Sequence, residues 1–377
     1  MRRRDLLIRV AGLAGMMPIG LSASTTNKPA LGYLSVRADI HRRYYVSGID
    51  HQGKIIFDLP LHGRGHSIAV HPNQHEAVVI ARRPGRYLQP IDIQNGRLLN
   101  PIECWEDRHL YGHGIYSPDG SRFYTTENDF DGNRGVIVVR DVNDNYRRID
   151  EFESHGIGPH ELCLLSDQET LVVANGGIQT HPDFGRTPLN LAHMSPSLVY
   201  LNRHSGELIE KRKLQKSLHK NSIRHLAVGI DDTVCFAMQY QGPRTDRPPL
   251  IGVHRHGEKI CLTSAPRDIL AAMQNYCGSV CADSSGQAFA VSSPRGGLIT
   301  FWAAKNAKYL GTIEIVDGCG IAPCASPGEF FLSSGTGGLY RYRISDSRLE
   351  RLQPGNHASH LWDNHISHLN QRSAQAC

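Results

Sequence analysis

Long apolar segments and a strong net charge are both missing from the body of the chain. Beyond the first 24 residues, no run approaches the roughly 20 apolar residues of a membrane-spanning helix. The formal net charge of the 377 residues is only +5, and most of it comes from four arginines near the N-terminus. A weakly charged body excludes binding to nucleic acid or to an acidic membrane through bulk charge. We therefore expect no nucleic-acid partner and no membrane anchor.

Common catalytic and cofactor motifs are missing as well. The nine cysteines include no Cys-x-x-Cys pair, which excludes covalent c-type haem and zinc ribbons. There is no Gly-x-Ser-x-Gly, no His-Glu-x-x-His and no phosphate-binding loop. No arrangement of residues therefore indicates catalysis, and we expect a binding protein. A metal-dependent enzyme of unknown reaction stays open as an alternative.

The N-terminus has the pattern of an export signal. Arg3 and Arg4 are followed by one polar residue and two leucines, and a weakly apolar stretch then leads to small residues at 22–24. This pattern predicts a twin-arginine signal peptide over residues 1–24 and a periplasmic mature chain, residues 25–377. The apolar stretch is too short and too rich in glycine to remain as an anchor. The alternative is a basic start of a cytosolic protein.

The body of the chain repeats one pattern. Gly65-His-Ser-Ile-Ala-Val and Gly112-His-Gly-Ile-Tyr are two copies, each with a polar or glycine start, a short apolar strand and a turn rich in Ser, Pro, Asp and Gly. We call the His or Cys that opens each copy a ring position. Successive ring positions are 42 to 65 residues apart, and they are His66, His113, His160, His225, Cys277, Cys319 and His365.

A period of 40–50 residues with three more strands in each unit predicts an all-β, seven-bladed β-propeller. Only about one strand of chain follows His365, whereas three strand-like runs, residues 31–36, 44–49 and 55–59, precede His66. We therefore expect the N- and C-terminal strands to share the closing blade, because such closure leaves no sheet edge exposed. A pair of β-sandwiches is the alternative, but it does not explain one register along the whole chain.

The long step between His160 and His225 contains an insertion, residues 176–197. The second strand of each unit ends in a polar loop on the same face as the ring positions. The insertion leaves from one of these loops, so we expect it to lie over the channel mouth as a lid. Extra loops on one face mark a binding face. A solvated surface loop is the alternative.

The candidate site residues lie at this mouth. Every ring position carries a residue type that ligates transition metals, and rotational repetition would bring such residues together. The pattern predicts a transition-metal ion on His66, His113, His160 and His225, with hydrogen bonds between blades as the structural alternative. The mouth loops and the insertion predict a site for a small polar ligand, formed by Arg82, Glu127, Asn128, His155, Asn175, His181, Arg186, Gln239 and Arg295.

Several motifs resemble those of an exported bacterial family, among them residues 154–160, 174–178, 317–320 and 362–365. Over nearly the whole mature length the chain resembles domain-of-unknown-function family number fifteen-thirteen. Its members look like seven-bladed propellers of the quinoprotein amine dehydrogenase β-chain and YVTN-repeat type. They tend to be encoded beside imelysin-like and di-haem oxidoreductase-like proteins, in gene clusters linked to iron.

The resemblance implies a periplasmic accessory or binding role in metal acquisition, with iron as the metal and imelysin-like or di-haem periplasmic proteins as partners. It supplies no catalytic residues. We expect a monomer. The alternative is a scaffold that binds a partner protein and no ligand.

Overall fold

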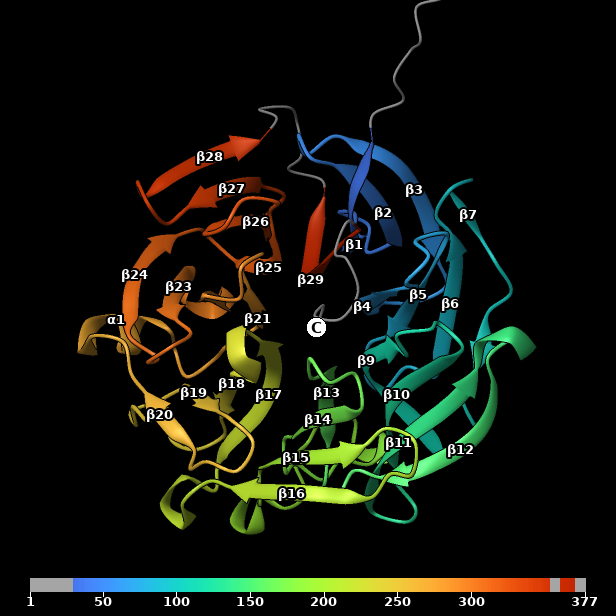
Figure 1. Cartoon of the computed structure of the whole chain (residues 1–377), viewed down its shortest axis with the longest axis horizontal. Helices are drawn as coiled ribbons and strands as arrows, with labels where there is room; N and C mark the ends of the chain where they lie inside the picture. The colour runs from blue at the N-terminus through green and yellow to red at the C-terminus, as the bar shows by residue number, and fades with distance from the viewer. Residues whose placement is uncertain (1–29, 353–359, 370–377) are drawn as a thin grey trace, which may run out of the picture.

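A computed structural model describes residues 30–352 and 360–369 of the chain. These residues form seven antiparallel sheets around a central axis, which Figure 1 shows in a view down that axis. Six sheets have four strands, and the seventh carries an additional short strand. The predicted all-β, seven-bladed propeller is therefore confirmed. The predicted signal peptide, residues 1–24, lies outside the described residues.

The strands of each blade run in order from the axis to the rim. The innermost strands contact one another in turn around the channel; they are β4 (Gly65–Val70), β9 (Arg108–Tyr116), β13 (Pro159–Leu164), β17 (Asn221–Val228), β21 (Ser279–Ala282), β25 (Gly318–Pro323) and β29 (Leu361–His368). The second strands are β1 (Leu31–Ala38), β5 (Glu76–Ala81), β10 (Arg122–Asp129), β14 (Thr170–Asn175), β18 (Val234–Tyr240), β22 (Ala288–Ser293) and β26 (Glu329–Ser334).

The two outer strands of each blade complete the sheets. The third strands are β2 (Tyr44–Asp50), β6 (Tyr87–Asp92), β11 (Arg134–Asp141), β15 (Ser197–Asn202), β19 (Ile251–His254), β23 (Leu298–Ala303) and β27 (Leu339–Arg343). The rim strands are β3 (Ile55–Leu61), β7 (Arg97–Leu98) with β8 (Ile102–Glu103), β12 (Arg147–Glu153), β16 (Leu208–Lys213), β20 (Cys261–Thr263), β24 (Tyr309–Glu314) and β28 (Arg348–Leu352).

The closing blade is shared between the two ends of the described chain. Its strand order is β29-β1-β2-β3, so one C-terminal strand pairs with three N-terminal strands, as predicted. Residues 33–35 of β1 pair with residues 366–368 of β29 in antiparallel register. The three predicted runs begin at the residues where β1, β2 and β3 begin. Closure gives the inner strand of the first unit, β4, a neighbour on both sides.

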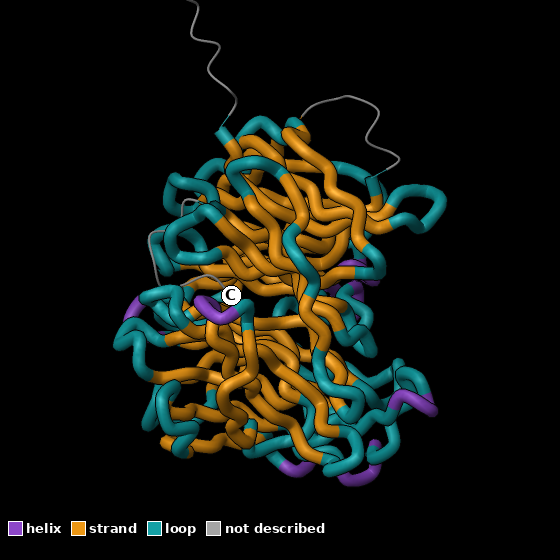
Figure 2. Tube along the Cα trace, turned by 90° about the vertical axis from the view of Figure 1, so that its right-hand side faces the viewer, coloured by secondary structure: helices purple, strands orange, loops and turns teal. Residues whose placement is uncertain are grey.

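The apolar core lies between neighbouring blades. Every residue of β13 and β14 is buried, whereas the rim strand β3 alternates between half-buried and exposed. This difference arises because inner strands are covered on both faces by adjacent blades, while rim strands face water on one side. Figure 2 shows the strands filling the interior, with loops and short helical turns around them. In the described part of the chain, no helix is long and apolar enough to cross a membrane.

Candidate functional site

Five of the ring positions meet as one group of imidazoles at the axis, which we call the histidine cluster. Each comes from a different inner strand: His66 from β4, His113 from β9, His160 from β13, His225 from β17 and His365 from β29. The ring centroids of His66 and His365 are 4.5 Å apart, and those of His160 and His225 are 4.8 Å apart. No member is more than 9% exposed. The convergence expected from rotational repetition is therefore present.

A local irregularity of the strands aims these side chains at the axis. The ladder between β13 and β14 shifts register around His160, and the ladder between β17 and β18 shifts next to His225. Similar shifts occur where β4, β9 and β29 carry their histidines. A β-bulge bends its strand and redirects the side chain at that point. Position 112, just before His113, requires a glycine, because a Cβ there would lie 2.5 Å from the His66 ring.

The imidazole nitrogens are close enough for shared ligation. The nitrogens of His66, His113 and His160 form one group of three, and His113, His225 and His365 form another; within each group the atoms lie within 4.8 Å of one another. Two nitrogens on one tetrahedral zinc ion are roughly 3.4 Å apart, since each bond is about 2.0–2.1 Å long. Ligation therefore requires ring movements of the order of 1 Å.

Two buried carboxylates contact the Nδ1 atoms of three of these rings. The Glu161 oxygens lie 3.3 Å from His113 Nδ1 and 3.1 Å from His225 Nδ1. Asp363 Oδ1 lies 3.1 Å from His66 Nδ1. An ionised carboxylate only accepts hydrogen bonds, so each of these Nδ1 atoms donates its proton to a carboxylate and each Nε2 points away from it. Metal-bound histidines are typically held in this way.

Three nitrogens of the cluster have nothing to bind among the described residues. His113 Nε2, His160 Nδ1 and His365 Nε2 are buried and have no hydrogen-bond partner within residues 30–352 and 360–369. Buried polar atoms without partners are rare and costly in folded proteins. Each group of three contains two of these histidines: His113 and His160 in the first, and His113 and His365 in the second. A metal ion bound by either group would lie beside two of them, and imidazole donors fit a transition metal such as iron, zinc, copper or nickel.

The protonation states suit the same chemistry. Burial lowers the pKa of His66 to about 3 and also lowers the pKa values of three further members, His160, His225 and His365. These rings are therefore neutral at pH 7, which is the ligand form. Burial alone would raise the pKa of Glu161, but the neighbouring His113 and His225 hold it well below its usual range. The cluster thus combines neutral donors with a buried negative charge.

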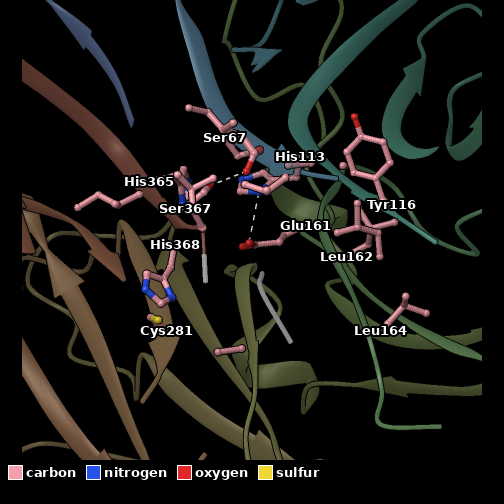
Figure 3. Close-up of a pocket in the computed structure, with 18 of the residues that line it drawn as sticks. Ser67, His113, Tyr116, Glu161, Leu162, Leu164, Cys281, His365, Ser367 and His368 are labelled. Carbon is pink, nitrogen blue, oxygen red and sulfur yellow. Dashed lines mark hydrogen bonds and ion pairs between the residues drawn. The ribbon is translucent and has the colours of Figure 1, made fainter. Parts of the chain in front are cut away.

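Cavities lie on both sides of the cluster. Further down the inner strands, a cavity of about 150 Å³ is lined by His113, Glu161 and His365 among apolar residues, and Figure 3 shows His113 between the other two. On the mouth side, His66, His160 and His225 form part of the wall of a second cavity of about 270 Å³. We call this second cavity the arginine chamber, because its lining includes Arg82, Arg83, Arg186, Arg224 and Arg295.

The sequence of residues 59–369 matches the family model described as "Protein of unknown function (DUF1513)". The chain belongs to this family. The resemblance found in the sequence is thereby confirmed. A search of the curated proteins found no match.

Solved structures share the fold of this DUF1513 propeller. Hydrazine synthase of Kuenenia stuttgartiensis has a TM-score of 0.58 at 14% identity and covers 89% of this chain and 99% of its own. A chain of the mitotic checkpoint complex has a TM-score of 0.55 at 12% identity, with 76% and 78% covered. At these identities the likeness concerns the fold alone.

The predicted ligand residues divide into two groups. The DUF1513 propeller brings four of them to the arginine chamber: Arg82, Arg186, Gln239 and Arg295. Arg82 and Arg295 lie on loops that follow second strands, Gln239 lies near the end of the second strand β18, and Arg186 lies on the insertion. Arg186 donates a hydrogen bond of 3.0 Å to the backbone oxygen of Arg83 across the mouth. The insertion therefore reaches the same mouth as the other loops.

The other five predicted ligand residues do not line the chamber. Glu127 is buried within its blade, where it pairs with Arg140 at 2.9 Å. Asn128 donates to the Thr180 backbone oxygen, and Asn175 donates to that of Ser154. The remaining two are partly exposed beside acidic residues outside the chamber, and they are His155 and His181. These residues form hydrogen bonds and ion pairs with neighbouring strands and loops, and so they do not face the mouth. An alignment of the repeats does not show such partners.

Cys277 and Cys319 do not join the cluster, contrary to the idea that all ring positions converge. Cys277 lies in an apolar cluster with Met273 and Trp302. Cys319 lies in another with Phe331. The inner strands of these two blades therefore contribute packing and no metal ligand to the cluster.

Sequence reasoning missed Glu161, Arg224 and Asp363. Each is adjacent to, or two residues from, a ring histidine, and each is buried. A charged residue close to a predicted ligand was the signal available in the sequence. It was not decisive because the bulges, which set the direction of these side chains, are not visible in the sequence.

Proposed function

We propose that this DUF1513 propeller is an exported, periplasmic binding protein that holds a transition-metal ion on the histidine cluster and serves metal acquisition. The observation that supports this most is the convergence of buried imidazoles into two groups of three, each of which contains two histidines with a ring nitrogen that has no partner in the described chain. Imidazole suits iron, copper, zinc and nickel. Among these, the resemblance to an iron-linked family favours iron.

In this proposal each residue has a defined part. The five histidines supply nitrogen donors from five blades, so the ion would be held at the axis by rigid inner strands. Glu161 and Asp363 orient the rings through Nδ1 and offset the charge of the ion. Binding from a rigid scaffold, with no catalytic motif in the sequence, is the basis for proposing a binding or accessory role.

The export part of the proposal rests on Arg3 and Arg4. Replacing both with lysine should leave the protein in the cytoplasm, because the twin-arginine pair is the recognised part of such a signal. Cell fractionation with an antibody to the protein measures this. If the double variant is still found in the periplasm, the signal assignment is wrong. Imelysin-like or di-haem periplasmic partners belong to the proposal through the family resemblance alone.

Metal binding is tested on protein purified from the periplasm. Elemental analysis should find one ion for each chain, and calorimetry of the metal-stripped protein should show tight binding of Fe²⁺, Cu²⁺ or Zn²⁺. The His113→Ala/His160→Ala variant should bind at least about 100-fold more weakly, because it removes two donors from one group of three. The matched control is His62→Ala/His75→Ala, since both residues are exposed on loops. Equal binding by all three proteins would refute the metal site.

A further inference from the structure

The arginine chamber holds more positive charge than its own residues neutralise. Five arginines line it, and no aspartate or glutamate does. Of the five, Arg82 pairs with Asp363 at 3.5 Å. Within the described residues the other four form no salt bridge at all, and two buried guanidinium nitrogens, Arg224 Nε and Arg83 Nη1, have no hydrogen-bond partner.

These charges are held close together. Burial lowers the pKa of Arg224 to about 9, and Arg83 adds to this effect. Burial and the nearby Arg82 and Arg83 lower the pKa of Arg186. Arg224 is buried and Arg83 is half-buried, and buried charges in proteins are normally paired because an unpaired one is costly to desolvate. The chamber therefore has the electrostatics of a site that lacks its counter-ion.

The arginines also face one cavity from several different elements, so they could bind one ligand together. They come from the loop after β5, the insertion, the inner strand β17 and the loop after β22. Arg295 lies over the Tyr276 ring at 4.2 Å, and Arg83 lies near the Tyr111 ring at 5.8 Å. Stacking on an aromatic ring restrains a planar guanidinium and leaves its edge donors available. Such donors match the two oxygens of a carboxylate or phosphate group.

We propose that the arginine chamber binds a small polyvalent oxyanion, one that carries several carboxylate or phosphate groups. The cavity of about 270 Å³ suits a small molecule. Several guanidinium groups approaching from different elements require an anion with more than one charged group, since a monovalent ion would leave most of them unpaired.

This inference deepens the proposed function and rests on it in one respect, the position of the metal. Three members of the histidine cluster, His66, His160 and His225, also line the chamber. The arginines would slow the entry of a bare cation through the mouth by electrostatic repulsion. An anionic complex of the metal would be attracted instead. The oxyanion is therefore inferred to be a ligand of the metal, so that the two arrive as one complex.

The anion site is tested first without any metal. The mature chain, stripped with a chelator, is titrated by calorimetry with tricarballylate, citrate and pyrophosphate at constant ionic strength set by chloride. We expect binding of at least one of them. The Arg186→Gln/Arg295→Gln variant should bind that anion at least about tenfold more weakly, because each lost guanidinium removes charge-assisted hydrogen bonds. Comparing tricarballylate with pyrophosphate distinguishes a carboxylate from a phosphate ligand.

The variants are chosen so that folding does not confuse the result. Arg186 and Arg295 are both exposed at the mouth, so their replacement should leave the melting temperature unchanged. Arg224→Gln is the stronger second variant and is interpreted only if it melts like the wild type. Arg97→Gln is the control, since this exposed arginine lies at the rim and pairs with Asp92. Equal anion affinity in all variants, or no binding up to about 10 mM, would overturn the inference.

Failure of this inference and failure of the metal site are distinguishable. Anion binding that depends on the arginines but no metal binding would sustain the chamber and refute the metal proposal. If metal binding depends on the histidines but the arginine variants bind the anion as tightly as the wild type, the proposed anion site is refuted. If both hold, citrate should raise the affinity for the metal, and the metal should raise the affinity for citrate by the same factor. Independent binding of the two would overturn the inferred contact between them.

Discussion

The inner ring of this propeller has two unlike halves. In one half, five adjacent inner strands, from β29 through β17, each present a histidine to the axis. In the other half, β21 follows Cys277 and β25 contains Cys319, and both cysteines are buried in apolar clusters. The repeat places a comparable residue at each position, yet only the first half forms a candidate site.

The difference lies in what surrounds each ring position. At β25 a Cβ on Gly320 would lie 2.7 Å from the Ile366 side chain of β29, so the strand itself approaches its neighbour closely. Cys319 then fills the space between the strands and makes contacts with backbone oxygens, such as that of Asp363 at 3.3 Å. In the histidine half, larger polar rings and two buried carboxylates occupy the corresponding space. The repeat therefore sets where each ring residue lies. Whether that residue packs in the core or can bind a metal depends on its type.

The largest effect should come from opening the ring between the two halves. β29 carries His365 and lies between β25 and β4. Deleting residues 31–61 would remove β1, β2 and β3, and β29 would lose the strand that it pairs with. We expect insoluble protein, or loss of a cooperative thermal transition measured by circular dichroism. A soluble deletion variant with a native-like transition would contradict circular closure.

Acid should destabilise the histidine half selectively. His66, His160, His225 and His365 have lowered pKa values in the folded state, so below pH 6.5 the unfolded state binds more protons and stability falls with pH. Each such group costs up to about 1.4 kcal/mol for each pH unit. Neighbouring Glu161 and Asp363, whose pKa values are lowered, stay ionised there.

The measurement is denaturant unfolding of metal-free protein between pH 7.5 and pH 5. We expect a loss of several kcal/mol across this range. The cysteine half contributes nothing to it, since burial raises the pKa of Cys277 and of Cys319 to about 12. The His62→Ala/His75→Ala variant should show the same loss as the wild type. Constant stability from pH 7 to pH 5 would contradict neutral, buried histidines.

Replacing one buried glutamate from each half sharpens the comparison. Glu161→Gln removes the charge that orients His113 and His225, and metal affinity should fall about 10–100-fold. Glu329→Gln changes a similarly buried glutamate on β26, which pairs with Arg343. Its metal affinity should match that of the wild type. Calorimetry on both variants decides the matter, and an equal loss in both would mean that Glu161 acts through general stability.

The smallest effect on metal binding should come from the ring cysteines. Cys319→Ala removes one buried sulfur, so we expect the free energy of unfolding to fall by about 1 kcal/mol. Metal affinity should stay unchanged, because Cys319 contacts backbone and Ser333 and not the histidine nitrogens. Denaturant unfolding and calorimetry measure the two quantities. A clear drop in metal affinity would bring the cysteine half into the site.

Much of the architecture could be predicted from the sequence. The number of blades and the shared closing blade follow from the repeat and from the strand-like runs before His66, because local turns and apolar strands set the period and sheet edges demand closure. The common mouth for the histidines and the loops after the second strands follows from strand direction. These features depend on chain order and on short-range patterns, which a sequence contains directly.

Only the tertiary structure decided which of those residues form the site. Glu127 and Asn175 have the same polar character as Gln239, yet their partners are supplied by neighbouring strands and loops, and they turn away from the chamber. Glu161 and Arg224 are buried beside the ring histidines because bulges in β13 and β17 redirect their side chains. A bulge and a hydrogen-bond partner depend on strands far apart in the chain. For this physical reason the sequence determined where the ring lies, and the packing of the blades determined what the ring contains.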